Sequence, residues 1–196
     1  MTTTTLDLGP QAAEVARLAA GVRDDQLDAP TPCADTPVAA LLDHLVGLSL
    51  AFRLAAEKRS EPPPPAASAD ALVPDWRERL PRQLDELVAA WRAPEAWEGM
   101  TEVGGVTMPA PQIAVVGLDE LLVHGWDLAA ATGQEFRVAD ADAEACLGFV
   151  DQVNGGGRVS PPGLFGPAVP VPDDAPVLDR LLALTGRDPG WTPPAR

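Results

Sequence analysis

Apolar side chains recur every third or fourth residue over long stretches of this chain, which is the spacing of one face of an α-helix. A first helix is predicted over residues 10–27. A second is predicted over residues 37–58, because Asp35-Thr36 can cap it and Pro37 suits the first helical position. Apolar residues surround much of this second helix, which predicts a deeply buried position. They are Leu41, Leu42, Leu45, Val46, Leu48 and Leu50.

Proline and glycine separate the next elements. The consecutive prolines at residues 62–65 exclude a helix and predict an extended linker. A third helix with one apolar face follows, and Pro81 must either kink it or mark its start. That face consists of Leu72, Trp76, Leu80, Leu84, Leu87 and Trp91. Residues 94–111 predict a loop with one short extended piece at residues 103–108.

In the second half of the chain, the spacing of apolar residues and the positions of proline and glycine predict two longer helices and a short final one. A helix over residues 111–133 opens with a proline and closes at Gly133, the glycine expected just past a helix end. Another helix is predicted over residues 140–154, where three glycines end it. After a proline-rich excursion, residues 176–185 predict one short last helix.

These elements favour an all-α fold, namely a four-helix bundle with an additional short C-terminal helix and Pro/Gly-rich loops. A chain of 196 residues can bury a sizeable core without a metal or a disulfide. We predict a single domain over residues 1–196, with the core bundle at about 10–154 and a C-terminal loop and short helix at about 155–196. Sites in such bundles are built from inward-pointing side chains on facing helices.

The strongly acidic composition narrows the classes of partner. The chain has 14 Lys and Arg against 29 Asp and Glu, a formal net charge of -15. Its field repels phosphate backbones and anionic lipid surfaces, so no nucleic acid and no membrane is expected as a partner. Two cysteines, Cys33 and Cys146, are too few for a secreted disulfide framework, and no signal or membrane-spanning stretch is apparent. A cytoplasmic location is therefore predicted.

Ionisable residues interrupt the apolar pattern of the helix predicted over residues 111–133. Glu120 and His124, four residues apart, stand on the same face one turn from each other, and Asp127 falls near that line. Apolar or small residues continue the stripe, which predicts that it faces the interior: Ile113, Gly117 and Ala131. Asp127 is expected either to accept a hydrogen bond from an imidazole or to pair with an arginine.

The only other histidine of the chain, His44, lies in the middle of the second predicted helix. It too is expected to point inward. If the two helices face each other, His44, His124 and Glu120 converge. Two nitrogens and one oxygen, with further positions open, are the ligand set of a catalytic divalent metal site. The alternative is that the histidines are core residues hydrogen-bonded to a carbonyl or carboxylate, and that Glu120 and His124 form a simple pair.

Three stretches of the sequence resemble a known family. They are TPCADTPVAALLDHLVG, DELLVHGWDLAAATGQ and FGPAVPVPDDAPVLDRLLALTGRDPGW. Together they resemble a DinB-like group of small metal-binding proteins related to the mycothiol-dependent maleylpyruvate isomerases, and the likeness extends over nearly the whole chain. Relatives usually have Gly-Trp after the Pro-Cys, where this chain has Ala34-Asp35-Thr36, so the mouth of a pocket near the second helix is expected to be more open or more polar.

The resemblance implies a DinB-like bundle with a divalent metal at one end of its core, usually zinc and alternatively nickel. Its ligands would be His44, Glu120 and His124. From this we predict a metal-dependent transferase or isomerase in which a low-molecular-weight thiol, such as mycothiol, attacks a small electrophile, with Asp127 as a catalytic residue that orients a ligand.

Two other readings stay open at this point. One is a non-catalytic metal-binding or stress-response protein that uses the same site. The other is a helical interaction domain whose histidines are satisfied core groups. Cys33 is expected to be a small buried apolar residue, or else to lie near the start of the second helix, where its thiol pKa would fall. The substrate, the metal, the role of the C-terminal segment and the oligomeric state, a homodimer included, do not follow from the sequence.

Overall fold

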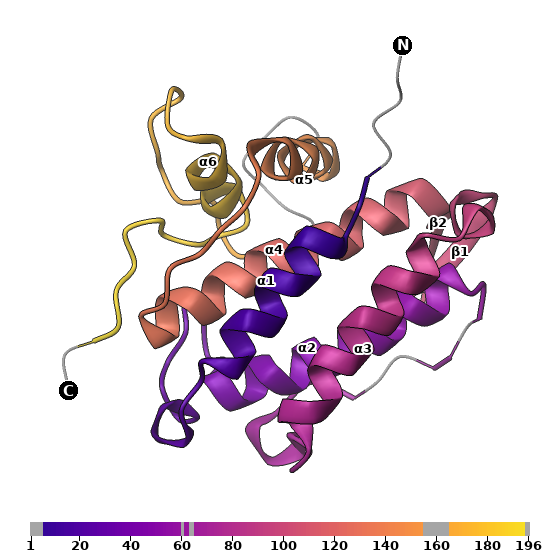
Figure 1. The fold of residues 1–196 in the computed structure, drawn as a ribbon. Helices are drawn as coiled ribbons and strands as arrows, with labels where there is room; N and C mark the ends of the chain where they lie inside the picture. The colour runs from indigo at the N-terminus through magenta and orange to yellow at the C-terminus, as the bar shows by residue number, and fades with distance from the viewer. Residues whose placement is uncertain (1–5, 60, 63–64, 155–164, 195–196) are drawn as a thin grey trace.

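The structure is a computed structural model that describes residues 6–59, 61–62, 65–154 and 165–194. It confirms the predicted helical bundle, in which the first and third helices lie against the second and fourth (Figure 1). The four bundle helices are α1 (Gly9–Ala20), α2 (Val38–Ala56), α3 (Trp76–Trp91) and α4 (Ala110–Thr132). The last two helices were also predicted within one residue, and they are α5 (Asp140–Val153) and α6 (Val177–Leu184).

Helix α4 lies between two hydrophobic clusters. One cluster fills the bundle of α1 to α4, and the other lies where α5 and α6 pack beside α4 (Figure 1). Consecutive residues of α4 serve different clusters, because Leu121 belongs to the first and Leu122 to the second. The helix is therefore apolar around much of its circumference, and the edge that carries polar side chains is narrow.

Helix α2 is the most apolar helix of the bundle. By length and composition alone, the stretch Val38–Ala56 could cross a membrane. However, 67% of that stretch is buried inside the protein, so packing in the bundle accounts for its apolar sequence. The helix begins at Val38, and the predicted side-chain cap is wrong. Backbone carbonyls cap it instead, since the amides of Val38 and Ala39 donate to Ala29 and Leu27 at 3.0 and 2.9 Å.

Two predicted helix boundaries were also wrong. α1 ends at Ala20 rather than near residue 27, and the 3-10 turn η1 (Asp24–Gln26) follows it. Carboxylates are unfavourable at the negative end of a helix, which explains why the acidic pair that opens η1 does not extend α1. α3 begins at Trp76, so Leu72 precedes it and Pro81 lies inside it rather than marking its start.

A β-hairpin replaces the single extended piece predicted at residues 103–108. β1 (Met100–Val103) pairs antiparallel with β2 (Val106–Pro109). Gly104 and Gly105 both have positive φ, at 58° and 80°, as a tight hairpin turn requires. A short 3-10 turn, η3 (Pro94–Trp97), connects α3 to this hairpin.

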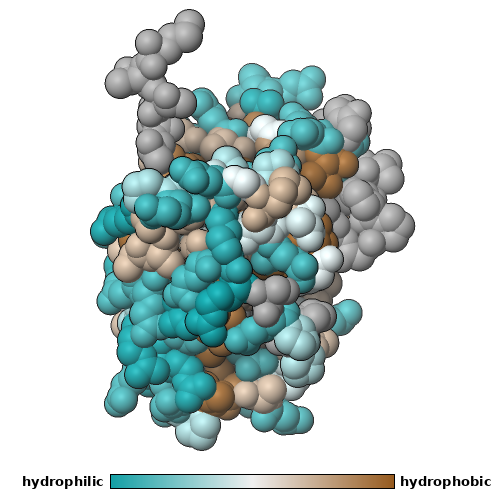
Figure 2. All heavy atoms as spheres, turned by 90° about the vertical axis from the view of Figure 1, so that its right-hand side faces the viewer, coloured by the Kyte–Doolittle hydropathy of each residue, from teal (hydrophilic) through white to brown (hydrophobic). Residues whose placement is uncertain are grey.

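The hairpin lies on the side of the molecule that is turned toward the viewer in Figure 2. That face is largely hydrophilic, with apolar side chains in small separate areas (Figure 2). Met100 and Val106 of the hairpin are the large apolar residues that the described structure leaves most exposed. The polar surface agrees with the acidic composition of the chain.

Glu14 joins α1 to the segment between α4 and α5. Its carboxylate accepts hydrogen bonds from Arg17 at 2.6 and 2.8 Å and from the backbone amide of Arg137 at 2.9 Å. The hydrogen bond from Arg17 outweighs the effect of burial and lowers the pKa of Glu14. The carboxylate therefore stabilises the fold above its ordinary pKa of 4.5, and this stabilisation is lost as the pH falls through the lowered value.

We expect Glu14→Gln to lower the free energy of unfolding at pH 7 by about 1 kcal/mol, a value reduced because Arg17 is partly exposed. As the pH is lowered toward 3 the difference from the unchanged protein should shrink, since the Glu14 carboxylate is progressively protonated as the pH falls toward its lowered pKa. Urea denaturation at the two pH values measures this. Glu135→Gln, at an exposed carboxylate nearby, is the control with little expected effect. An equal difference at both pH values would contradict the assignment.

Candidate metal centre

A close approach of α2 and α4 creates the candidate site. At Gly117 of α4, an added Cβ would lie only 2.9 Å from Cδ1 of Phe52 on α2. Phe52 is buried, so its ring has little room to move away. The absence of a side chain at Gly117 thus lets the two helices meet, and it does so one turn before Glu120.

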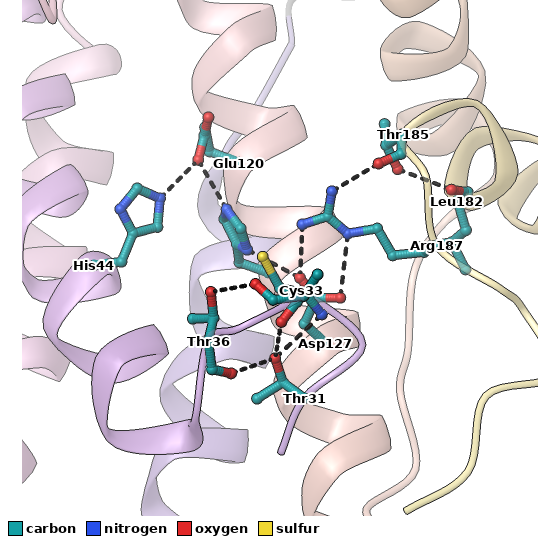
Figure 3. Close-up of polar contacts among 11 residues, drawn as sticks. Thr31, Cys33, Thr36, His44, Glu120, Asp127, Leu182, Thr185 and Arg187 are labelled. Atoms are coloured by element: carbon teal, nitrogen blue, oxygen red, sulfur yellow. Dashed lines mark hydrogen bonds and ion pairs between the residues drawn. The ribbon is translucent and has the colours of Figure 1, made fainter. Parts of the chain in front are cut away.

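The two helices bring three of the predicted residues together. His44 points from α2 toward Glu120 on α4 (Figure 3), with 3.2 Å between His44 Nε2 and Glu120 Oε2. The same carboxylate oxygen lies 3.3 Å from Nε2 of His124. The two imidazole rings meet edge to face with their centroids 4.7 Å apart. Each residue offers one ligand atom, and these atoms all lie within 4.8 Å of one another.

The site is more open than the apolar stripes had predicted. The side chain of His44 is 39% exposed and that of Glu120 is 30% exposed, whereas His124 is 13% exposed. His44 thus points toward α4 as expected, but its side chain is only partly buried. The cluster therefore lies at an edge of the bundle, with His44 and Glu120 partly exposed to solvent.

Asp127 makes both contacts that had been considered as alternatives. Its Oδ2 lies 3.0 Å from Nδ1 of His124 and 3.0 Å from Nη2 of Arg187, and the aspartate side chain is fully buried. Arg187 reaches this point from the segment that follows α6 (Figure 3). The sequence analysis missed Arg187, because no helical spacing connects it to residues 60 positions earlier.

Opposite charges in the cluster lie close enough to shift one another's pKa values. Burial opposes ionisation of Glu120, but hydrogen bonds from His124 and His44 outweigh it and hold the pKa of that carboxyl below its usual range. Burial likewise disfavours a charged His124, yet Asp127 and Glu120 raise its pKa to about 10. A cation at Nε2 of His124 would therefore compete with a proton that the two carboxylates favour.

Asp119 is a second residue that the sequence analysis missed. It is buried on α4 beside Glu120, and its Oδ1 has no hydrogen-bond partner in the described part of the chain. Burial, with repulsion from Glu120, raises the pKa of Asp119 to about 8. Its position in an apolar helix next to a predicted ligand was the available signal.

Cys33 is half-buried rather than buried, which corrects the expectation of a small core residue. It lies in the loop before α2, on the side of the site where Asp127 and Arg187 meet (Figure 3). Thr31 holds the loop, since its hydroxyl donates to the carbonyl oxygen of Thr36 at 2.8 Å and accepts from the backbone amide of Cys33 at 3.1 Å. The thiol is therefore a neighbour of the candidate ligands and not one of them.

The three donors suit a divalent ion of the zinc type. Zinc binds imidazole nitrogen and carboxylate oxygen at about 2.0–2.1 Å, so two ligand atoms of a tetrahedral site lie about 3.3 Å apart. The separations of 3.2 and 3.3 Å between Glu120 Oε2 and the two Nε2 atoms are compatible with this value, and they are also the lengths of hydrogen bonds within the cluster, whereas the whole donor set spans up to 4.8 Å. Three protein donors at a partly exposed edge leave a further coordination position for a small ligand.

Comparison with known proteins decides the family. The family model described as the mycothiol maleylpyruvate isomerase N-terminal domain matches residues 8–129. The chain belongs to this family. The matched region runs from the start of α1 through most of α4 and contains His44, Glu120, His124 and Asp127, whereas Arg187 lies beyond it. The resemblance drawn from the sequence motifs is thus confirmed.

Two proteins of Mycobacterium tuberculosis, from strains CDC 1551 / Oshkosh and H37Rv, are similar to this member of the family. Both are described as uncharacterised. Each is 32% identical over 177 residues, which cover 88% of this chain and 91% of the relative. The similarity therefore extends over much of the C-terminal part that the family model does not reach.

Crystal structures of the mycothiol-dependent maleylpyruvate isomerase and of a point mutant of that enzyme resemble this chain in fold. The TM-scores are 0.53 and 0.55, with 19% and 18% sequence identity. The likeness covers 73% of this chain and 65% of the isomerase chain, so less than two thirds of that enzyme is represented. At this level of identity the match establishes the DinB-like bundle and nothing about the reaction.

Proposed function

We propose that the chain binds one divalent cation, preferably zinc, through His44, Glu120 and His124. We further propose that it uses this site to activate a low-molecular-weight thiol of the mycothiol type for attack on a small electrophile. The class of thiol is suggested by the family name. The cytoplasm, where such thiols are kept reduced, is the proposed location.

The observation that supports the proposal is the convergence of two imidazole nitrogens on one carboxylate oxygen, at 3.2 and 3.3 Å, from two different helices. A core histidine needs one acceptor, which a carbonyl or hydroxyl can supply. Here both histidines of the chain share the same carboxylate at a partly exposed edge. This is a costly arrangement for stability alone and a useful one for holding a cation.

Each residue of the cluster has a separate part in the proposal. Glu120 supplies a negative charge between the two imidazoles, and His44 and His124 supply neutral nitrogen donors when deprotonated at Nε2. Asp127, predicted as a catalytic residue, acts here by orienting His124, because its carboxylate accepts from Nδ1 at 3.0 Å. The exposed side of His44 leaves room for a thiol to approach.

Zinc supplies one chemical effect when bound, namely that it promotes loss of the proton of a ligating thiol and so makes the sulfur a nucleophile at neutral pH. The thiol sulfur then bonds to an electrophilic carbon of the substrate. When that carbon belongs to a carbon–carbon double bond, the π electrons move to the neighbouring carbon, and in a transfer reaction this carbon takes up a proton while the sulfur stays attached. In an isomerisation it leaves again after rotation about the bond that its addition has made single, so the thiol is regenerated.

Calorimetric titration tests the proposal. We expect the metal-free protein to bind about one equivalent of zinc, and the zinc-loaded protein to bind mycothiol that the metal-free protein does not bind. Turnover is then assayed with electrophilic acceptors. Glu57→Gln, an exposed substitution just past the other end of α2, is the control that should behave like the unchanged protein. Zinc binding without thiol binding would favour a non-catalytic metal-binding protein, and no zinc binding would contradict the proposal.

A further inference from the structure

The segment after α6 is shaped so that Arg187 enters the candidate site. α6 ends in a paired hydrogen-bond motif, in which the amide of Gly186 donates to Ala183 at 3.2 Å and the amide of Arg187 donates to Leu182 at 2.8 Å. Gly186 has a φ of 83°, and an added Cβ would lie 2.7 Å from Cα of Gly166. A side chain is therefore excluded at Gly186, and the turn it forms aims Arg187 back toward α4.

Arg187 holds both oxygens of Asp127. Its Nη2 lies 3.0 Å from Oδ2 and its Nε lies 3.4 Å from Oδ1, so one edge of the planar guanidinium faces both carboxylate oxygens. Nη1 donates to the carbonyl oxygen of Thr185 at 2.8 Å, which fixes the third arm of the fork. The arginine side chain is 10% exposed and the aspartate is fully buried. The carboxylate plane therefore has little freedom to rotate.

The same carboxylate contacts His124. Oδ2 of Asp127 lies 3.0 Å from Nδ1 of His124 and also 3.0 Å from Nη2 of Arg187. The orientation that Arg187 imposes on Asp127 thus determines where Nδ1 of the imidazole finds its acceptor. A metal-binding histidine is oriented by the partner of its other nitrogen, and such partners affect metal affinity strongly.

From this chain of contacts we infer that Arg187 is a positioning residue of the metal centre, which acts through Asp127 on His124. The inference rests on the proposed function, because it assigns Arg187 a role toward the proposed ion. It also makes the C-terminal segment part of the site, although the family model ends at residue 129. A purely structural Arg187 would only attach that segment to α4.

Zinc affinity, measured by competition with a chromophoric chelator, separates the two roles. We expect Arg187→Lys, which keeps the charge and loses the planar fork, to bind zinc about tenfold more weakly. The visible spectrum of the cobalt-substituted protein should shift as well. Arg180→Lys, at a half-buried arginine on α6, is the matched control and should leave both unchanged. Far-UV circular dichroism reports whether each variant is folded.

A double-mutant cycle tests whether the effect passes through Asp127. In an Asp127→Asn background, Arg187→Lys should weaken zinc binding less than twofold further. Arg187→Gln, which retains one donor, serves as a second variant should the lysine variant not fold. A folded variant at position 187 with the zinc affinity of the unchanged protein would overturn the inference, as would a full additive loss in the Asp127→Asn background. If the unchanged protein binds no zinc, the proposed function has failed, and this inference fails with it.

Discussion

The variant His44→Ala, His124→Ala is expected to contain no zinc after dialysis against the metal, whereas the unchanged protein should contain about one equivalent. The double substitution removes both imidazoles of the chain and leaves Glu120 as a single donor. One carboxylate at a partly exposed edge cannot compete with water for zinc, which requires several protein ligands in a stable site. Elemental analysis of protein purified without a histidine tag measures the result directly.

A milder substitution, at the proposed carboxylate ligand Glu120, tests the same site. Glu120→Gln keeps the shape of the side chain and removes its charge, so we expect zinc to bind more weakly while the helices remain in place. Glu57→Gln provides the matched loss of one carboxylate away from the cluster.

Zinc retained by the double histidine variant would show that the ion binds elsewhere. If the unchanged protein contained no zinc after dialysis against the metal, the histidines would serve hydrogen bonding alone.

The second large effect is expected at Asp127. Asp127→Leu leaves the guanidinium of Arg187 in a nearly closed environment without its carboxylate, and breaking a buried pair in this way costs about 3–5 kcal/mol. The double variant Asp127→Leu, Arg187→Met removes both charges and should recover part of that loss, since Nδ1 of His124 still lacks its acceptor. Urea denaturation in the presence of a chelator measures the free energy of unfolding without a contribution from metal.

The free energy of unfolding and the zinc affinity should respond differently in the double variant. Its stability is expected to return toward that of the unchanged protein, but its zinc affinity should stay low because His124 has lost the acceptor for Nδ1. A stability loss below about 1 kcal/mol for Asp127→Leu would show that water reaches Arg187 readily. In that case the pair would not be the buried interaction that its low exposure indicates.

The pairing of Glu120 with His124 could be predicted from the sequence because four-residue spacing on a helix leaves one geometry. The participation of His44 needed one further assumption, that α2 and α4 face each other. Their contact depends on the packing of Gly117 against Phe52, which lies in tertiary structure and not in the periodicity of either helix. The sequence marked His44, Glu120 and His124 as candidates, and the fold brings these three together.

Other features could not be predicted for identifiable reasons. Arg187 contacts the site through a turn at the end of a short helix, and one arginine among many carries no local signal of a distant partner. The end of α1 depends on a choice between continuing a helix and forming a 3-10 turn, which differ by little free energy. The exposure of His44 depends on how the whole bundle edge is covered, which no single stretch of sequence determines.

The position of α4 between two hydrophobic clusters has a consequence for how the protein unfolds. Leu121 and Leu122 place adjacent side chains in different clusters, so neither cluster can open without exposing apolar surface of the same helix. The bundle and the α5 and α6 layer should therefore behave as one cooperative unit rather than as two that melt in turn. Glu120 and His124 lie on that shared helix, so the geometry at their edge persists until the entire unit is lost.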